Sequence, residues 1–277
     1  EATTLKFELT PPEALTPGGY EIEAVATLDG REYREGFQRI AYHHIQTRYL
    51  FRPARATIQV LDVQVAPVRV GYIMGVGDEV AEAARQLGAD VVMLDEKDLA
   101  EGNLSQFDLI ITGIRSYFNR TDLRAYNQRL LEYVENGGTM IVLYNRQEWD
   151  DAQWGPYPAK YSRSRITVEE APVRILEPTH PLFNDPNRIT ENDWKGWVQE
   201  RGTYFLGERD ERYRDLLASE DPWEYNAGEK RGMLVEAQYG KGRWIYVGLT
   251  LFRQLPAGVP DAYKFFANLL SLPKAPR

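Results

Sequence analysis

Apolar and polar residues alternate with a period of two through the first part of the chain. The alternation is clear in residues 5–9 and 58–65, and Asp29-Gly30 interrupts it between them. This pattern is typical of short antiparallel strands, and an Asp-Gly pair is a strong signal for a hairpin turn. The predicted strands are fewer than the roughly seven of an immunoglobulin-like sandwich. We therefore predict that residues 1–66 form a small, partial antiparallel β-sandwich segment of immunoglobulin-like type.

The pattern changes at residue 67, where short apolar runs begin to alternate with helical periodicity. Apolar residues recur at helical spacing from Val80 to Leu87, and residues 261–270 show the same spacing. Strands that alternate with amphipathic helices are typical of βαβ units around a parallel sheet. We therefore predict an α/β domain of flavodoxin-like or Rossmann-like type over residues 67–277. Its strands are expected at residues 68–74, 91–94, 107–113 and 139–144, followed by a hairpin at 232–249.

Residues 145–230 interrupt this regular pattern and are rich in Trp, Tyr, Pro, Asn and Arg. A long irregular stretch inside a compact domain is often functional. We predict an aromatic-rich insertion that binds a ligand or packs on a partner. Trp194 and Trp197 are its candidate ligand-binding residues, because an exposed indole can stack on a sugar ring. The alternative is that these indoles form the core of the insertion.

The composition of the chain excludes several kinds of chemistry. The net charge is −8, cysteine is absent and there are three histidines. The acidic balance argues against a nucleic-acid surface, and no apolar run is long enough to span a membrane as a helix. Without cysteine there is no disulfide, no thiolate metal site and no cysteine nucleophile. His43 and His44 are adjacent in a predicted strand and would point to opposite faces, so we predict no metal site.

Polar and aromatic side chains follow three of the predicted parallel strands. The candidates are Asp78, Glu79, Arg115, Tyr117, Tyr144 and Asn145. The carboxyl ends of parallel strands meet at one edge of a sheet, where open α/β sheets bind their ligands. Arginine pairs with anions and tyrosine offers a flat face with a hydroxyl, so this set suits a sugar or a carboxylate. The alternative is a buried ion pair between Arg115 and Asp78 or Glu79.

Two further features of the sequence are candidate binding sites. Residues 75–77 form a glycine-containing turn between a strand and a helix, but position 80 is valine where a dinucleotide fingerprint needs its third glycine. Two acidic residues also stand where a pyrophosphate would bind, so we predict no cofactor. His180, in the sequence His-Pro-Leu-Phe, is a ligand-binding candidate whose alternative role is that of a hydrogen-bonded turn residue.

Several segments resemble known families. Residues 113–117, at the end of a strand, resemble the class I glutamine amidotransferase-like fold, and the late hairpin and final helix resemble its ThuA-like branch. An ordered set of segments is similar to the C-terminal region of bacterial PIG-L (LmbE-like) deacetylases: residues 72–79, 127–131, 144–145, 155–160 and 197–202. This resemblance implies an amidotransferase-like domain within a larger, secreted N-acetyl-sugar deacetylase.

The chain departs from these families at the residues that carry catalysis. An active class I glutaminase has a cysteine nucleophile on the turn after its third strand, where this chain has Gly-Ile-Arg-Ser at residues 113–116. Ser116 lacks the Gly-x-Ser-x-Gly surroundings of a serine nucleophile, and the His-Pro-Asp-Asp type motif of the zinc deacetylase domain is missing. The resemblance therefore implies a degenerate, noncatalytic accessory region. It would pack on an upstream catalytic domain of the same polypeptide or bind carbohydrate, outside the cytoplasm.

Two other functions remain open at this point. One is a ThuA-like enzyme that acts on a sugar, with Asp78, Glu79 or His180 as the acid or base, since such work needs only a suitable pKa and correct reach. The other is a structural subunit of a cell-surface assembly, which would form oligomers through the open edge of its β segment.

Overall fold

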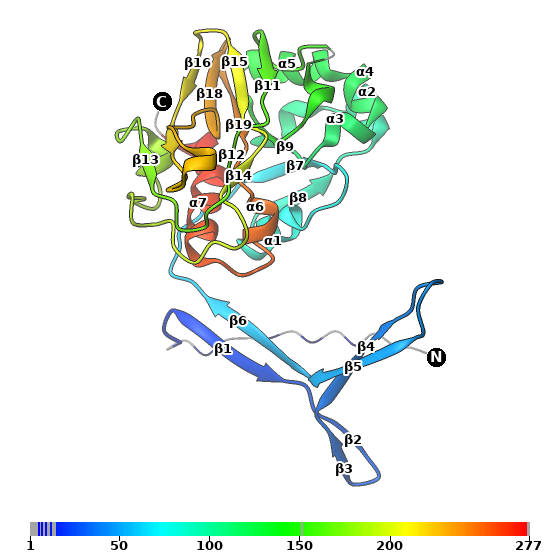
Figure 1. Cartoon of the computed structure of the whole chain (residues 1–277). Helices are drawn as coiled ribbons and strands as arrows, with labels where there is room; N and C mark the ends of the chain where they lie inside the picture. Colours follow the sequence, from blue (N-terminus) through cyan, green and yellow to red (C-terminus); the bar gives the residue numbers. More distant parts are fainter. Residues whose placement is uncertain are drawn as a thin grey trace. The chain divides into compact units, whose positions relative to one another are not determined.

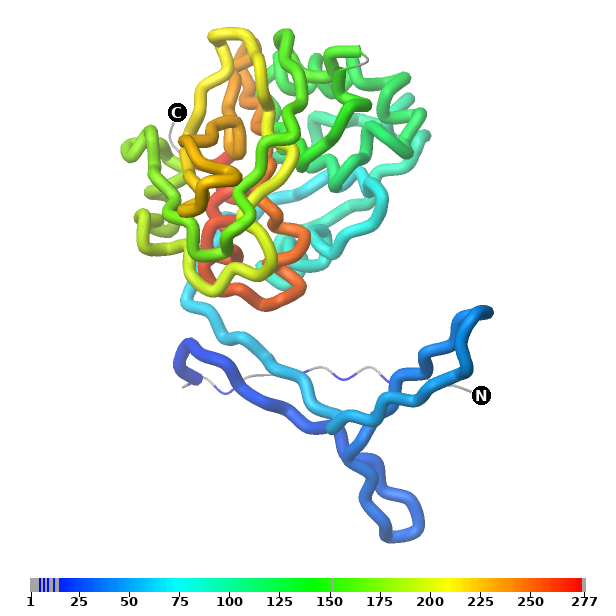
Figure 2. Tube along the Cα trace, viewed as in Figure 1, coloured from blue at the N-terminus to red at the C-terminus, as the bar shows by residue number. Residues whose placement is uncertain are grey.

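The computed structural model describes residues 15–150 and 152–275 together with Leu5, Phe7, Leu9 and Pro12. The chain divides into two compact units, Glu1–Asp62 and Val63–Arg277. This boundary falls close to the change of sequence pattern at residue 67. Figures 1 and 2 show both units along the chain, from the N-terminal strands to the C-terminal helix.

The described residues of the N-terminal unit form three antiparallel strand pairs. They are β1 (Gly18–Glu23) with β6 (Arg55–Val60), β2 (Ala26–Leu28) with β3 (Arg31–Tyr33), and β4 (Glu35–Ile40) with β5 (Arg48–Pro53). Asp29 and Gly30 both have positive φ, 51° and 76°, and close the β2–β3 hairpin as their sequence predicts. His43 and His44 lie in a turn, not in the predicted strand, because the chain reverses there between β4 and β5.

The described residues of this unit form no hydrophobic core. None of them up to residue 62 is buried, and Phe37 and Phe51 are 65% and 64% exposed. Strand pairs of this kind are marginal alone, because they need further strands or a helix to cover an apolar face. The predicted sandwich, which requires two packed sheets, stays a prediction. The strand predicted over residues 5–9 lies partly outside the described residues, because residues 6 and 8 are not among them.

The second unit is built on a seven-stranded sheet. Its order is β16 (Tyr213–Asp215), β18 (Leu234–Tyr239), β19 (Gly242–Val247), β10 (Thr139–Leu143), β9 (Leu109–Thr112), β7 (Arg69–Ile73) and β8 (Asp90–Met93). The strands from β19 to β8 are parallel, whereas β18 and β16 add antiparallel strands at one end. The order β8-β7-β9-β10 is that of flavodoxin-like folds. The predicted α/β fold with its late hairpin is therefore confirmed.

Helices cover both faces of the sheet (Figure 1). On one face, Leu123, Leu130 and Val134 share a core with Ile110 and Met140 of the sheet. The helices near this face are α2 (Glu96–Glu101), α3 (Ser116–Asn119), α4 (Thr121–Ala125) and α5 (Asn127–Glu135). The other face is covered by α1 (Val80–Gln86), α6 (Leu251–Gln254) and α7 (Pro260–Ser271). Short 3-10 turns join these elements: η1 (Leu104–Gln106), η2 (Gln147–Trp149), η3 (Pro181–Phe183), η4 (Glu224–Asn226) and η5 (Leu272–Lys274).

The aromatic-rich insertion is more regular than its sequence predicts. It contains three short antiparallel ladders, namely β11 (Ala159–Tyr161) with β15 (Leu206–Arg209), β12 (Arg165–Ile166) with β14 (Gly202–Thr203), and β13 (Val173–Ile175) with β17 (Leu217–Ser219). Strands of two to four residues are too short for a period-two pattern to be recognised. Each ladder pairs segments far apart in sequence, so the insertion folds back on itself.

Candidate functional site

The carboxyl ends of β7, β9, β10 and β19 meet at one edge of the sheet. After β7 the chain adds β8 on one side of β7, and it then adds β9 and β10 on the other side. The direction in which strands are added reverses here, so the carboxyl ends of β7 and β9 form the switch point of the fold. The loop after β9 carries Arg115, the loop after β10 carries Tyr144 and Arg146, and α6 after β19 carries Arg253. These side chains form the site described below.

Arg115 occupies a sharp turn between β9 and α3. Its φ and ψ are 50° and 32°, in the left-handed region that costs a non-glycine residue of the order of 1–3 kcal/mol. The turn is held from two sides, because the Arg115 N–H donates to the Tyr144 carbonyl at 2.9 Å and the Val76 N–H donates to the Ile114 carbonyl at 3.1 Å. A Cβ at Gly75 would lie 1.9 Å from that same Ile114 oxygen, so only glycine fits there.

The Arg115 side chain pairs with Glu148. Its Nε donates to Glu148 Oε1 at 3.2 Å, and its guanidinium lies 4.2 Å from the centre of the Phe118 ring. Glu148 is 9% exposed, so this ion pair is largely shielded from water. The alternative partners weighed from the sequence, Asp78 and Glu79, are therefore wrong. Glu148 comes from η2, a short turn that no periodic pattern predicts.

Asp78 is fully engaged by its own surroundings. Its carboxylate accepts the Tyr72 hydroxyl at 2.5 Å, the Val80 N–H at 3.1 Å and the Ile114 N–H at 3.2 Å. Burial and the adjacent carboxylate raise the pKa of Tyr72 well above its usual value, so the phenol stays protonated as a donor. Asp78 therefore ties β7 to the Arg115 turn. Glu79, the residue at the N-cap of α1, is exposed and makes no side-chain capping bond.

Tyr144 lies at the centre of an aromatic and cationic cluster. Its ring stacks on Tyr204 at 5.5 Å and packs against Phe252 at 5.4 Å. The guanidinium of Arg146 lies 4.8 Å from the centre of the Tyr204 ring. Burial raises the pKa of Tyr144, and the positive charges of Arg115, Arg253 and Arg146 oppose this rise. We call Arg115, Tyr144, Arg146, Tyr204, Phe252 and Arg253 the carboxyl-edge cluster.

Buried polar residues hold this cluster in place. The Asn145 N–H donates to the Tyr246 hydroxyl at 3.1 Å, and that hydroxyl donates to the Tyr204 carbonyl at 2.6 Å. Tyr204 itself has a positive φ of 52°. The Asn145 side chain accepts the Tyr117 N–H, and the Tyr117 hydroxyl donates to Asn127 at 2.7 Å. Tyr117 and Asn145 are both fully buried. These two predicted site residues therefore position the cluster from below and offer no surface to a ligand.

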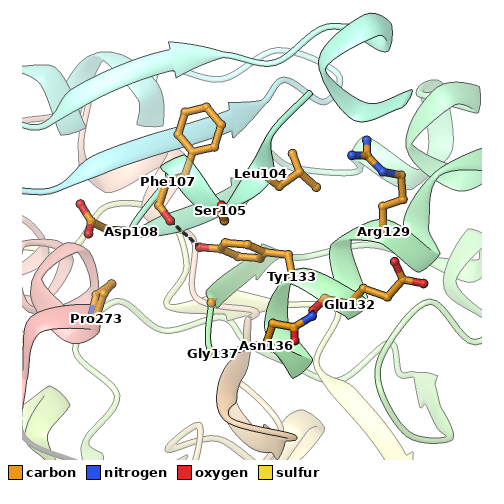
Figure 3. Close-up of a pocket in the computed structure, with 11 residues that line it drawn as sticks. Leu104, Ser105, Phe107, Asp108, Arg129, Glu132, Tyr133, Asn136, Gly137 and Pro273 are labelled. Atoms are coloured by element: carbon orange, nitrogen blue, oxygen red, sulfur yellow. Dashed lines mark hydrogen bonds between the residues drawn. The ribbon is translucent and has the colours of Figure 1, made fainter. Parts of the chain in front are cut away.

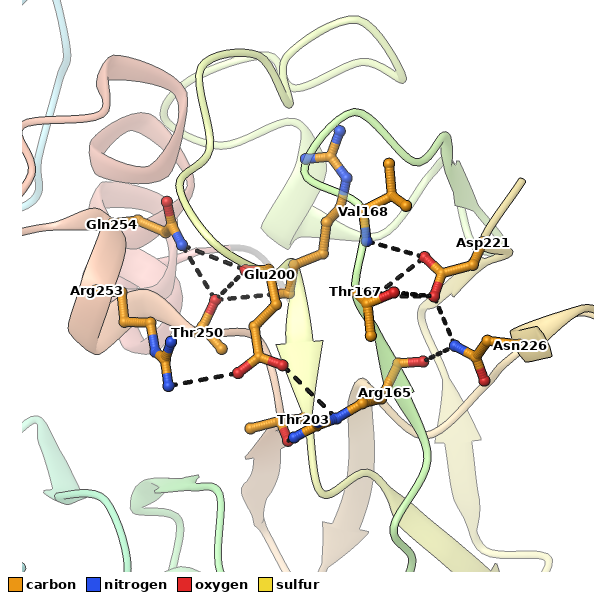
Figure 4. A network of polar contacts seen from close by, with 11 residues as sticks. Arg165, Thr167, Val168, Glu200, Thr203, Asp221, Asn226, Thr250, Arg253 and Gln254 are labelled. Carbon is orange, nitrogen blue, oxygen red and sulfur yellow. Dashed lines mark hydrogen bonds and ion pairs between the residues drawn. The ribbon is translucent and has the colours of Figure 1, made fainter. Parts of the chain in front are cut away.

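A second network of polar contacts extends from the cluster into the insertion (Figure 4). Glu200 lies between Arg253 at 3.5 Å and Arg165 at 3.7 Å. Nearby, the buried Asp221 accepts two backbone N–H groups and the Thr167 hydroxyl, and Asn226 donates to it. Burial would raise the pKa of Asp221, but these hydrogen bonds lower it. The network fixes how the insertion approaches the carboxyl edge.

The remaining predicted site residues lie elsewhere. Trp194 and Trp197 are 3% and 5% exposed, and Trp194 packs on Phe265 of α7 at 5.4 Å. Their predicted role as exposed platforms is wrong, because the insertion needs them in its core. His180 caps η3 and contacts Glu236 across the face of the sheet that α7 covers.

Sequence reasoning missed part of the carboxyl-edge cluster. Arg146 is not among the missed residues, because it follows the same strand end as Tyr144 and Asn145 and belongs to the predicted polar and aromatic set. Tyr204, Phe252 and Arg253 reach the cluster from segments whose course depends on tertiary pairing. No local pattern in the sequence brings them next to Tyr144.

A separate cleft of about 540 Å³ lies at the amino ends of β9 and β10 (Figure 3). Its floor contains Phe107 and Tyr133, whose hydroxyl donates to the Phe107 carbonyl at 3.2 Å. Arg129 at its side already donates to the carbonyls of Leu99 and Gly102. Because its arginine is engaged by backbone, this cleft offers a ligand less than the carboxyl edge does.

Within residues 15–150 and 152–275, no group of histidine and carboxylate side chains is arranged to hold a metal ion. In the same part of the chain, no helix has the length and apolar character needed to cross a membrane.

Comparisons with known proteins give similarity in structure only. No family model and no curated protein matches the sequence. Among solved structures, the chain is similar to a cytoplasmic protein of Salmonella typhimurium, with 10% identity, a TM-score of 0.45 and coverage of 92% of this chain and 95% of that one. It is also similar to a glutamine amidotransferase of Thermotoga maritima, with 12% identity, a TM-score of 0.44 and coverage of 76% and 95%.

A third similar structure is a β-galactosidase of Rahnella sp. R3, with 16% identity and a TM-score of 0.43. The match covers 77% of this chain but 32% of that enzyme. The proteins to which the chain is similar thus include a glutamine amidotransferase. The resemblance to PIG-L and ThuA-like proteins stays a prediction.

Proposed function

We propose that this chain is a noncatalytic accessory region of a larger, secreted PIG-L-like deacetylase, and that it binds carbohydrate at the carboxyl-edge cluster. The observation that carries the proposal is the packing of Tyr144 against Tyr204 and Phe252. The Arg146 guanidinium lies 4.8 Å from the centre of the Tyr204 ring, and that of Arg253 lies 5.1 Å from the centre of the Phe252 ring. Stacked tyrosines offer flat faces to a sugar ring, and guanidinium groups donate in planar pairs to hydroxyl or carboxylate oxygens. Side chains of these two kinds can bind either a neutral or an acidic sugar.

Three features support a binding role in place of catalysis. The strained turn that would present a nucleophile in an active amidotransferase presents Arg115. The neighbouring Ser116 is fully buried, and its Oγ has no hydrogen-bond partner within the described residues, so no base activates it. Asp78 and His180, two of the residues that a sugar-acting enzyme would use, already have their polar atoms engaged.

Titration calorimetry with the whole chain tests this proposal. The ligands would be a tetramer of N-acetylglucosamine and a tetramer of galacturonate. We expect at least one of them to bind, and Arg146→Gln to weaken that binding about tenfold through loss of a charge-assisted hydrogen bond. Arg212→Gln is the matched control, because Arg212 also lies over a tyrosine ring, that of Tyr157 at 3.7 Å, but precedes β16 in an exposed turn.

Absence of heat with both tetramers would remove the carbohydrate-binding version of the proposal. If Arg146→Gln and Arg212→Gln reduced the affinity equally, binding would depend on the overall positive charge of the chain and not on the carboxyl-edge cluster. The version in which the chain packs on an upstream catalytic domain would then be tested by co-purification of the two as separate polypeptides.

The N-terminal unit favours a second role in assembly. Its described strands expose large apolar side chains, among them Phe37, Phe51 and Tyr49 at 65%, 64% and 55%. Two-stranded ladders also leave backbone groups that a further strand can pair with. Light scattering at increasing protein concentration tests this role, and a chain that stays monomeric at the highest concentration would count against it.

A further inference from the structure

A charged cleft of about 330 Å³ lies on the sheet face opposite the α3–α5 helices. Val235 and Ala237 belong to the core beneath those helices, so Glu236 between them points to the other face. The cleft is bounded by β16, β18, β19 and the segment that leads into η3. Its lining residues are Glu177, Thr179, His180, Pro181, Arg214, Glu236, Gln238, Lys241 and Arg243.

Glu236 is the buried centre of this cleft. It is 6% exposed, and its Oε2 accepts a hydrogen bond from Arg214 at 2.7 Å and lies 3.1 Å from His180 Nε2. Burial would raise the pKa of Glu236, but the hydrogen bonds from His180 and Arg214 and the charge of Arg243 lower it, so the carboxylate is ionised. Its second oxygen, Oε1, has no hydrogen-bond partner within the described residues.

His180 is locked beside this carboxylate. Its Nδ1 accepts the Leu182 N–H at 3.1 Å, so that nitrogen carries no proton. The proton therefore lies on Nε2, where it is donated to Glu236. With both ring nitrogens engaged, His180 positions Glu236 and is not free to act on a substrate as a base. Glu236 Oε1 lies 3.8 Å from Arg243 Nη1, beyond hydrogen-bond distance. Oε1 therefore remains an acceptor whose hydrogen bond a ligand in the cleft can supply.

Positive charge surrounds the outer part of the cleft. The side chain of Arg214 is 52% exposed, and no ion pair within the described residues engages the Lys241 ammonium. The turn that carries Lys241 is firmly placed, because its N–H donates to the Glu135 carbonyl at 2.8 Å and a Cβ at Gly242 would meet the Val134 carbonyl at 1.9 Å. An anionic group would be attracted to these two cations.

We propose that this cleft binds a small polyhydroxylated acid, such as a sugar acid. A ligand hydroxyl donates to Glu236 Oε1 in the depth of the cleft, while the ligand carboxylate pairs with Lys241 and Arg214 near its mouth. A ligand that uses both the buried acceptor and the exposed cations of this cleft carries a hydroxyl and a carboxylate on one molecule. The site is distinct from the carboxyl-edge cluster and its occupancy does not depend on that cluster.

Nuclear magnetic resonance of the histidine rings provides a local test, since the chain has three histidines. The whole chain, labelled with ¹⁵N, would be titrated with glucuronate up to about 20 mM, a range that covers millimolar affinity. Glucose and inorganic phosphate would be titrated in the same way. We expect the ring signals of His180, assigned by their loss in His180→Asn, to shift and saturate with glucuronate while those of His43 and His44 stay in place.

Variants separate the outcomes. Lys241→Met keeps the length of the side chain and removes its charge. We expect it to weaken glucuronate binding about tenfold and to leave the His180 signals of the ligand-free chain unchanged. Lys97→Met, at an exposed lysine of α2, is the matched control and should leave the titration unchanged. An unmoved His180 signal, equal shifts with glucose, equal shifts with phosphate, or an undiminished affinity in Lys241→Met would each overturn the proposal.

Discussion

The Tyr246 hydroxyl joins two backbone groups beneath the carboxyl-edge cluster, and its removal should have a measurable cost. Tyr246 is 1% exposed, accepts the Asn145 N–H at 3.1 Å and donates to the Tyr204 carbonyl at 2.6 Å. Tyr246→Phe keeps the ring that packs near Trp244 and removes only the oxygen. Each buried polar group left without a partner costs about 1–3 kcal/mol, so for the two groups together we expect a loss of about 2–6 kcal/mol.

Urea unfolding followed by tryptophan fluorescence measures this loss. All six tryptophans lie after residue 62, so the signal reports on the α/β unit alone. Tyr263→Phe is the control, because the Tyr263 hydroxyl donates to the exposed Gln86 side chain at 2.7 Å, which water can replace. It should cost less than about 1 kcal/mol. A cost for Tyr246→Phe no larger than that of Tyr263→Phe would refute the role assigned to the buried hydroxyl.

Three further predictions concern stability of the same unit. Gly75→Ala should destabilise it by about 3 kcal/mol, near the upper end for overpacking, because the new Cβ meets a backbone oxygen; a neutral result in urea would contradict this. Trp194→Ala should cost about 3–5 kcal/mol and the half-exposed Trp223→Ala far less, as thermal unfolding would show. Asp221→Asn should lower the free energy of unfolding at pH 7. The difference from the wild-type chain should become smaller as the pH is lowered. The folded-state pKa of Asp221 is lowered, so its contribution is present above the unfolded value of about 3.9 and is lost as pH falls through the folded value. A deficit independent of pH between 3 and 7 would contradict that assignment.

The central sheet could be predicted because its strands carry their own signal. The buried runs ending at Ile73, Thr112 and Leu143 are continuous apolar segments, which is the pattern of parallel strands covered on both faces. That their carboxyl ends meet at one edge then follows from general rules of α/β folds. The strand order does not, because the flavodoxin-like and Rossmann-like arrangements differ in it. Arg115 and Tyr144 were placed at one edge by that reasoning alone.

The chemistry of the edge could not be predicted in the same way. The sequence offers Asp78 or Glu79 as the partner of Arg115, because both follow a strand that ends at the same edge of the sheet. The structure pairs Arg115 with Glu148, since the Asp78 carboxylate is already occupied by Tyr72 and two backbone N–H groups. Choices of this kind depend on the directions of individual side chains, which periodicity does not encode.

The same limit explains the tryptophans of the insertion. An indole that follows no regular pattern is equally compatible with a core and with an exposed platform. Trp194 is buried because α7 presents Phe265 to it, and α7 comes some seventy residues later in the sequence. By contrast, Trp223 is 46% exposed and packs only edge-on against Tyr225 among the aromatic rings.

Backbone strain links these observations to the proposed binding role. Two non-glycine residues of the carboxyl-edge cluster, Arg115 and Tyr204, have positive φ. Strain of this kind persists only where the surrounding structure holds the residue in place. Here the close approach of Gly75 to the Ile114 carbonyl holds the Arg115 turn, and the Tyr246 hydroxyl holds the carbonyl of Tyr204. A turn needed only to connect β9 to α3 could relax by placing glycine at position 115. Its arginine instead carries the strain while its guanidinium is held against Glu148 and Phe118, which makes presentation of that charge at the edge of the sheet the most direct physical reason for the turn.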